Sequence, residues 1–239
     1  MVFIKKNKAL KVAIIPARGG SKRIPNKNMK MFHGKPIIYY AIKTAIESNL
    51  FDEVFVSTDN KEIAEFSIKN GAKVPTYRSS KNADDYATTS EVLMEVINFY
   101  TTQNKKISMA CCIYPTSPLV KSKDLILANE VFEKQSIEVL ISSVKFSFPV
   151  QRGFFIFENK EIGLIDPEAI NKRSQDLAET YHDAGAFYLF NPQVFLKTGS
   201  LWKGKIGAYI LSEIQSQDID TIEDWKLAEL KYEYLQSNK

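Results

Sequence analysis

Residues 12–28 of the chain read VAIIPARGGSKRIPNKN. The apolar run Val12–Ala17 has the length and composition of a buried strand, and a pair of glycines follows it directly. Adjacent glycines allow backbone amides to turn inward and form a concave anion site. Four basic residues surround the glycines: Arg18, Lys22, Arg23 and Lys27. The stretch therefore predicts a strand that ends in a phosphate-binding loop.

The rest of the chain continues the alternation between short apolar runs and helical patterns. The further predicted strands are Glu53–Thr58, Met109–Tyr114, Val139–Val144, Ala186–Phe190 and Gly207–Leu211. The predicted helices are one beginning at Pro36, then Asn60–Asn70, Thr88–Tyr100, Lys121–Gln135 and Thr221–Leu235. This alternation predicts an α/β fold with a doubly wound, mostly parallel sheet. Ligands of such sheets bind at the carboxyl ends of the strands.

Residues 146–183 break the alternation. They hold a short strand-like pair, Phe154–Phe157 and Glu161–Ile165, and then polar, irregular sequence. No Pro-, Gly- or Ser-rich linker borders this segment, so residues 1–239 are expected to form one domain with an inserted arm.

Composition narrows the functional classes. The 239 residues carry a net charge of only +4, which does not favour a general nucleic-acid-binding surface. Residues 1–35, however, hold ten basic and no acidic residues, against 22 basic and 28 acidic residues in the remainder. The small total therefore hides a strongly positive N-terminal region, as expected for a local anion site.

The cysteines and the apolar segments indicate the compartment. Cys111 and Cys112 are adjacent, and neighbouring cysteines rarely form a strain-free disulfide. They are expected to be buried thiols in a reducing environment. No apolar run approaches the roughly 20 residues that span a bilayer, and the N-terminus lacks the apolar core of a secretory signal. A soluble cytoplasmic protein with no membrane partner is expected.

The loop matches neither the Walker A pattern nor the dinucleotide-binding G-x-G-x-x-G pattern. Instead, residues 17–22 (ARGGSK) followed by Lys27-Asn28 resemble the nucleotide loop of the cytidylyltransferases that activate nonulosonic acids, the relatives of CMP-sialic acid synthetases. The resemblance continues in order along the chain at VSTD (56–59), PTSPL (115–119) and DIDT (218–221). Segments 171–176 and 181–185 are most similar to the members that act on pseudaminic acid.

This resemblance implies a Rossmann-like nucleotidyltransferase fold and a reaction between CTP and a nine-carbon sugar acid. Three cations would stabilise charge on the triphosphate and form the catalytic set: Arg18, Lys22 and Lys27. The implied nucleotide-binding residues are Ala17, Gly19, Gly20, Ser21, Asn28, Arg78 and Thr88. Two alternatives stay open: Arg78 as a surface charge closing a strand, and Asp85 or Thr88 as a helix cap.

Asp218 and Asp220 lie two residues apart before the last helix. In an extended segment such residues point to the same side, and two carboxylates suit a hard cation such as Mg²⁺. The alternative is that they favour the positive end of the following helix. The resemblance implies that the pair binds Mg²⁺.

The sugar end departs from the sialic acid enzymes. Tyr114 replaces a glutamine usual before Pro-Thr-Ser-Pro, and residues 182–185 (HDAG) replace a segment with an arginine near an Asn-Gly-Ala turn. These departures favour pseudaminic acid over sialic acid. The implied sugar-binding residues are Tyr114, Gln151, Arg173, His182 and Asp183, with Arg173 as the candidate for the sugar carboxylate.

The inserted segment resembles the dimerisation arm of the family, and the resemblance implies a homodimer in which one subunit's arm borders the partner's sugar site. The aromatic residues of the segment would otherwise be ordinary core. Competing functions are a cytidylyltransferase for legionaminic or sialic acid, a UTP- or GTP-dependent nucleotidyltransferase, and a non-catalytic RNA-binding module. The aliphatic first strand and the aspartate pair do not favour the last.

Overall fold

The computed structural model describes residues 8–84 and 86–238. Its main sheet has the strand order β10-β6-β9-β5-β1-β4. The strands are β1 (Leu10–Pro16), β4 (Glu53–Ser57), β5 (Ile107–Ile113), β6 (Val139–Lys145), β9 (Tyr181–Phe190) and β10 (Ile206–Leu211). Strand β9 runs antiparallel to β5 and β6, and the other pairings are parallel. The predicted α/β fold with a mostly parallel sheet is confirmed.

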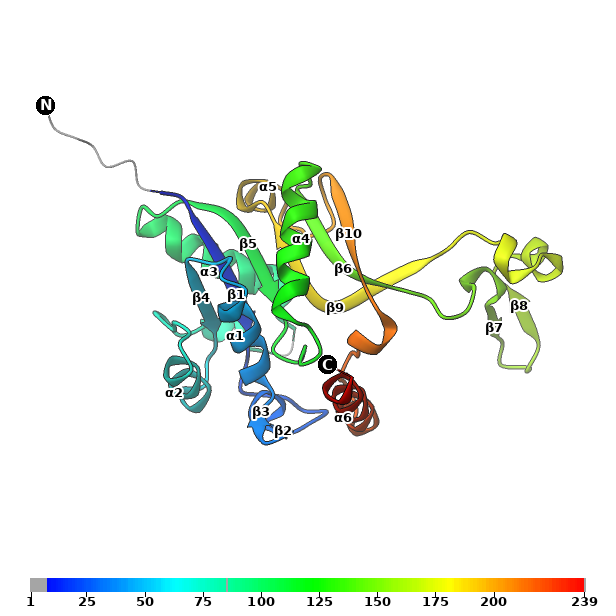
Figure 1. Cartoon of the computed structure of the whole chain (residues 1–239), viewed down its shortest axis with the longest axis horizontal. Helices are drawn as coiled ribbons and strands as arrows, with labels where there is room; N and C mark the ends of the chain where they lie inside the picture. Colours follow the sequence, from blue (N-terminus) through cyan, green and yellow to red (C-terminus); the bar gives the residue numbers. More distant parts are fainter. Residues whose placement is uncertain (1–7, 85, 239) are drawn as a thin grey trace, which may run out of the picture.

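Helices cover both faces of this sheet (Figure 1). Helices α1 (Ile38–Glu47), α2 (Lys61–Lys69) and α4 (Ser122–Lys134) share one core cluster with the sheet. Helices α3 (Thr89–Thr102) and α5 (Pro192–Thr198) pack into the cluster on the opposite face. Both Cys111 and Cys112 are fully buried free thiols on β5, as predicted.

A smaller third cluster lies beside the sheet, between the first hairpin and the last helix. Strands β2 (Met31–Phe32) and β3 (Lys35–Pro36) form the hairpin, and α6 (Ile222–Ser237) packs on it through Trp225. The ring of Trp225 meets that of Phe32 edge to face at 5.6 Å. Helix α6 begins with a capping box formed by Thr221 and Asp224.

Three elements differ clearly from the sequence predictions. Helix α1 begins at Ile38 rather than Pro36, because Pro36 pairs with Met31 in the hairpin. Strand β9 begins at Tyr181, inside the predicted insertion, because residues 181–183 pair with residues 143–145. The short helix α5 was not predicted, although Asn191 caps it through the backbone N–H of Gln193 and Pro192 opens it.

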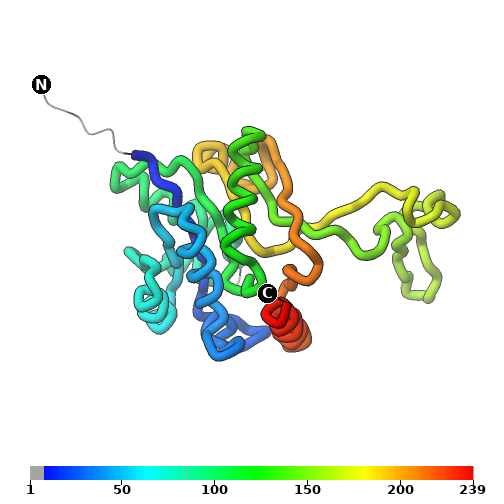
Figure 2. The backbone as a smooth tube through the Cα atoms, viewed as in Figure 1, coloured from blue at the N-terminus to red at the C-terminus, as the bar shows by residue number. Residues whose placement is uncertain are grey.

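The segment between β6 and β9 leaves the body of the molecule as an extended arm (Figures 1 and 2). We define the arm as residues 146–180. It contains the hairpin of β7 (Phe154–Ile156) and β8 (Ile162–Leu164), and short 3-10 turns at Val150–Arg152, Pro167–Asn171 and Ser174–Asp176. Side chains of the hairpin are exposed, including Phe155 at 63% and Ile156 at 68%. The alternative that the aromatic residues of this segment are ordinary core is therefore wrong within this chain.

Further 3-10 turns occur at Lys27–Met29, Ser80–Asn82 and Glu213–Gln215. Over residues 8–84 and 86–238, no helix combines the length and the hydropathy needed to cross a bilayer.

Candidate active site

A cavity of about 460 Å³ lies where β1 and β5 end, at the carboxyl edge of the sheet. Its walls are the loop after β1 and the segment after β5. The lining residues are Pro16, Arg18, Ser21, Lys22, Arg23, Lys27, Asn28, Tyr86, Tyr114, Pro115 and Thr116. Since β1 and β5 are parallel neighbours, the two segments meet at this edge, where ligands of such sheets bind. The cavity therefore contains the three predicted catalytic cations together with Ser21, Asn28 and Tyr114.

Two hydrogen bonds hold the glycine-rich loop in its conformation. The Asn28 side-chain amide donates to the carbonyl oxygen of Arg18 at 2.9 Å, and the Gly19 N–H donates to Asp59 Oδ1 at 2.9 Å. A Cβ atom on Gly19 would lie 2.9 Å from Cβ of Asn60, so only glycine fits against this N-cap residue of α2. The Gly19 amide thus anchors the loop, while a Cβ on Gly20 would meet nothing within 4 Å. Asp59, which only the family resemblance marked, is the anchor.

The loop meets the aspartate pair although about 190 residues separate them in the sequence. Arg23 Nη1 lies 2.7 Å from Asp220 Oδ2, and Lys27 Nζ lies 3.5 Å from Asp220 Oδ1. The Lys27 ammonium also donates to the carbonyl oxygen of Ile219 at 2.7 Å. Folding therefore places two cations of the loop on the segment that the sequence marked as a metal site.

The residues present fit a hard cation. Partial burial raises the pKa of Asp218, and the nearby charge of Asp220 raises it further. Part of the Asp218 surface is still exposed to solvent. A cation between the carboxylates would relieve this repulsion. Across the part of the chain that the structure describes, no group of three or more His, Cys, Asp or Glu residues gathers for a metal. Further ligands would be water and phosphate oxygens, as Mg²⁺ commonly takes.

The raised pKa of Asp218 makes a prediction about stability. The pKa of Asp218 is higher in the folded state than in the unfolded state, where it is near 3.8. The protonated carboxyl therefore stabilises the fold at low pH, and this stabilisation is lost as the pH rises through the folded-state pKa. Asp218→Asn is therefore expected to raise the melting temperature at pH 7 by roughly 1–2 °C, and the difference should vanish below a pH of about 4. Differential scanning calorimetry across this pH range measures it.

The control for this change is Glu223→Gln at the exposed start of α6, which should not raise the melting temperature, because the Glu223 carboxylate lies at the positive end of the helix. A lower melting temperature for Asp218→Asn than for wild type at pH 7 would contradict the electrostatic argument.

Arg78 is buried, which rules out its reading as a surface charge. It is 8% exposed, and its guanidinium donates from Nε to Ser57 Oγ at 3.1 Å and from Nη2 to the Ser57 carbonyl oxygen at 2.6 Å. Burial lowers the pKa of Arg78 to about 10, partly offset by Asp59. The arginine thus ties its own segment to the end of β4, next to the anchor of the loop, and it does not line the cavity.

Thr88 is the N-cap of α3, the alternative that the sequence left open. Its hydroxyl accepts from the backbone N–H of Glu91 and donates to the Glu91 carboxylate, and the two residues form a capping box. It lines a separate cavity with Ser79 and Lys81. Asp85, the other candidate helix cap, lies outside the described residues.

Tyr114 connects the cavity to Asp183 through a residue that sequence reasoning missed. The Tyr114 hydroxyl forms a 2.8 Å hydrogen bond with Thr89 Oγ1, and its ring meets Tyr188 edge to face at 5.8 Å. The Tyr188 hydroxyl donates to Asp183 Oδ2 at 2.5 Å. Burial raises the pKa of Tyr114 to about 12, so this phenol stays protonated. Tyr188 was predicted only as part of a strand, since its bond to Asp183 depends on where β9 begins.

The other three predicted sugar residues lie away from the cavity lining of their own chain. Gln151 donates to the Ala178 carbonyl oxygen at 2.9 Å within the arm, and Arg173 precedes the 3-10 turn at Ser174–Asp176. His182 lies at the base of the arm, with its ring 4.8 Å from that of Phe146. Because the arm points away from the body (Figure 1), one chain does not gather all five predicted sugar residues.

A doubly wound sheet whose first loop sets several cations against an aspartate pair is the arrangement of a nucleotidyltransferase. The family model described as cytidylyltransferase matches residues 12–197, and this chain belongs to that family. The chain is 40% identical to a pseudaminic acid cytidylyltransferase of Campylobacter jejuni, over 92% of this chain and 95% of the relative. It is 30% identical to the CMP-N,N'-diacetyllegionaminic acid synthase of Legionella pneumophila, over 91% and 94% of the two chains.

A solved structure of CMP:2-keto-3-deoxy-manno-octonic acid synthetase in complex with CTP superposes with a TM-score of 0.67. It covers 95% of this chain and 99% of its own, at 17% identity. At that identity the likeness bears on the fold alone, and it agrees with the sheet described above.

Proposed function

We propose that this chain transfers CMP from CTP to pseudaminic acid and releases pyrophosphate. The observation that supports it best is the convergence of the basic loop, the Asp218–Asp220 pair and Tyr114 around one region of the sheet edge. The sugar is inferred from the 40% identical relative and from the Tyr114 and HDAG departures.

In the proposed reaction, the anomeric hydroxyl of the sugar attacks the α-phosphorus of CTP. The bond from this phosphorus to the bridging oxygen breaks, the electron pair leaves with pyrophosphate, and the proton of the attacking hydroxyl passes to water. Such transfers require mainly positioning and charge neutralisation. Arg18, Lys22 and Lys27 line the cavity and would hold the triphosphate and neutralise the leaving group.

Asp218 and Asp220 would hold Mg²⁺, which supplies charge neutralisation at phosphate oxygens and lowers the pKa of a bound hydroxyl. Asp220 is bound by Arg23 and Lys27, so these cations must be released from it when the carboxylate takes up a metal. Both pairs are partly solvent-exposed and individually weak, which makes this exchange inexpensive. The released guanidinium and ammonium would then face the triphosphate. No side chain of the cavity is assigned as a general base.

We further propose that the enzyme is a homodimer joined by the arm. The hairpin of the arm exposes a row of large apolar side chains that a monomer would leave in water: Phe154, Phe155, Ile156, Phe157 and Ile162. A partner that covered these side chains would contact the arm that also carries Arg173 and Gln151. Light scattering at micromolar concentration should give the mass of a dimer, and the mass of a single chain would contradict the proposal.

A panel of pyrophosphate-release assays tests the proposed substrates. With CTP and Mg²⁺, pseudaminic acid is expected to give a kcat/KM at least about tenfold above those for legionaminic and sialic acids, since losing one good hydrogen bond to a charged group costs about that factor. UTP and GTP serve as nucleotide controls and should give little release. Equal or better rates with legionaminic or sialic acid would overturn the sugar assignment while leaving the cytidylyltransferase class intact.

A further inference from the structure

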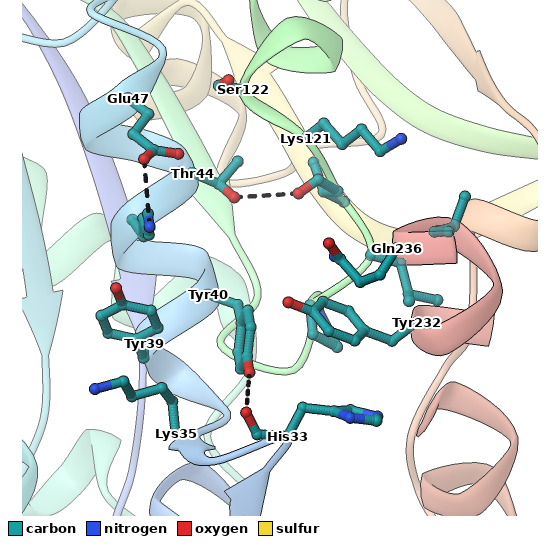
Figure 3. Close-up of a pocket in the computed structure, with 15 residues that line it drawn as sticks. His33, Lys35, Tyr39, Tyr40, Thr44, Glu47, Lys121, Ser122, Tyr232 and Gln236 are labelled. Atoms are coloured by element: carbon teal, nitrogen blue, oxygen red, sulfur yellow. Dashed lines mark hydrogen bonds and ion pairs between the residues drawn. The ribbon is translucent and has the colours of Figure 1, made fainter. Parts of the chain in front are cut away.

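A second cavity, of about 500 Å³, lies apart from the candidate active site (Figure 3). Its walls come from the β2–β3 turn, α1, the segment between β5 and α4, and the last turns of α6. None of its lining residues also lines the cavity at the glycine-rich loop. The volume is in the range of ordinary small-molecule sites. The proposed reaction uses nothing in this cavity.

The charge of this cavity is mainly positive. Lys35, Lys43 and Lys121 line it, and Glu47 is its one acidic residue among those described. Glu47 lies 3.5 Å from Lys43 and is therefore already paired. Within residues 8–84 and 86–238, Lys35 and Lys121 have no carboxylate within ion-pair distance, so their ammonium groups are available to an anion.

Aromatic rings line the space between these two lysines. Figure 3 shows Lys35 at the lower left and Lys121 at the upper right, with Tyr40 and Tyr232 between them. The rings of Tyr40 and Tyr232 meet edge to face at 5.3 Å, and His33 stacks on Tyr232 at 4.8 Å. These contacts fix the walls in place before any ligand arrives.

Hydroxyl groups in the walls of the cavity are already hydrogen-bonded to backbone carbonyl oxygens. The Tyr40 hydroxyl donates to the Phe32 carbonyl oxygen at 2.7 Å, and Thr44 donates to the Val120 carbonyl oxygen at 3.1 Å. Burial and the neighbouring Tyr232 raise the pKa of Tyr40, so its phenol carries no negative charge that would repel an anion. The centre therefore presents ring surface, and the ends present cations.

We propose that this cavity is a second ligand site, for an aromatic anion: a planar ring that carries a phosphate or a carboxylate. The ring would pack against Tyr40 and Tyr232, where edge-to-face contacts are favourable. The anionic group would lie at Lys35 or Lys121, whose ammonium groups bind phosphate or carboxylate with charge-assisted hydrogen bonds.

Isothermal titration calorimetry of the full chain tests this site, with phenyl phosphate and phenylacetate as probes, each titrated with and without CTP. One molecule of at least one probe per chain is expected to bind, and CTP should not displace it, because the two cavities share no lining residue. The double variant Lys35→Gln/Lys121→Gln should weaken this binding about tenfold or more. The matched control Lys123→Gln/Lys226→Gln removes two exposed lysines of α4 and α6 outside the cavity and should leave binding unchanged.

The outcomes separate the candidates. Comparison of the two probes tells whether the cavity prefers phosphate or carboxylate. Displacement of both probes by CTP would assign their binding to the glycine-rich loop and overturn the proposal. Inorganic phosphate binding as tightly as phenyl phosphate would also overturn it, since the rings would then contribute nothing. None of these readouts depends on turnover, so a failure here leaves the proposed function untouched.

Discussion

Asp220→Asn is expected to lower kcat of the proposed reaction by about two to three orders of magnitude, the scale observed when one charge-stabilising group is removed from an active site. The carboxylate lies 2.7 Å from Arg23 and 3.5 Å from Lys27. Together with Asp218 it forms the only aspartate pair among the described residues of the candidate active site. Losing its charge removes one of the two carboxylates that we propose hold Mg²⁺. Pyrophosphate release at saturating CTP and sugar acid, over a range of Mg²⁺ concentrations, measures the effect.

The fold should survive this change. The ion pairs of Asp220 are partly exposed, and such pairs contribute about 0–1 kcal/mol. The melting temperature is therefore expected to stay within a few degrees of wild type, as should that of the control Glu223→Gln, which must also keep full activity. Normal turnover in Asp220→Asn would remove the assignment of this residue, whatever the sugar.

Mixing two inactive variants is expected to restore activity. If Arg173 completes the sugar site of the partner, Arg173→Ala leaves its own body intact and Asp220→Asn leaves its own arm intact. Random exchange of subunits at equal amounts makes half of the dimers mixed, and each mixed dimer has one complete site. The mixture should therefore reach roughly a quarter of wild-type activity. Rates measured before and after subunit exchange give the gain.

A second pair of variants controls this experiment. Lys22→Ala and Asp220→Asn both alter the body of the subunit, so their mixed dimers have no complete site and should stay inactive. Recovery in the first mixture but not in the second supports an arm that serves the partner. No recovery in either mixture, with both chains dimeric by light scattering, would place Arg173 in the site of its own chain or outside any site.

Much of this molecule was predictable because the signals are local in the sequence. The apolar run Val12–Ala17 contains most of β1, and the Thr221–Asp224 capping box needs only four consecutive residues. The burial of Cys111 and Cys112 follows from the apolar run that contains them. The family motifs are local in the same sense, since each is a short string of residues in a loop after a strand.

The position of β9 was not predictable in this way. The residue pattern of 181–190 does not predict that the strand lies between β5 and β6 or that it runs antiparallel to both. Its early start at Tyr181 follows from pairing with residues 143–145. That pairing places Asp183 within reach of Tyr188, and hence connects it to Tyr114.

The sequence by itself determined the class of sheet and the family, and it singled out the glycine-rich loop as the candidate anion site, since hydrophobic periodicity and short loop motifs act over a few residues. Only the tertiary structure decided that Arg78 is a buried tie to Ser57, that Asp59 anchors Gly19, and that Arg23 meets Asp220. It also showed that the arm, which carries Gln151 and Arg173, extends away from the sheet (Figure 1). Each of these depends on contacts between residues distant in sequence, which form only when the sheet brings the ends of its strands together.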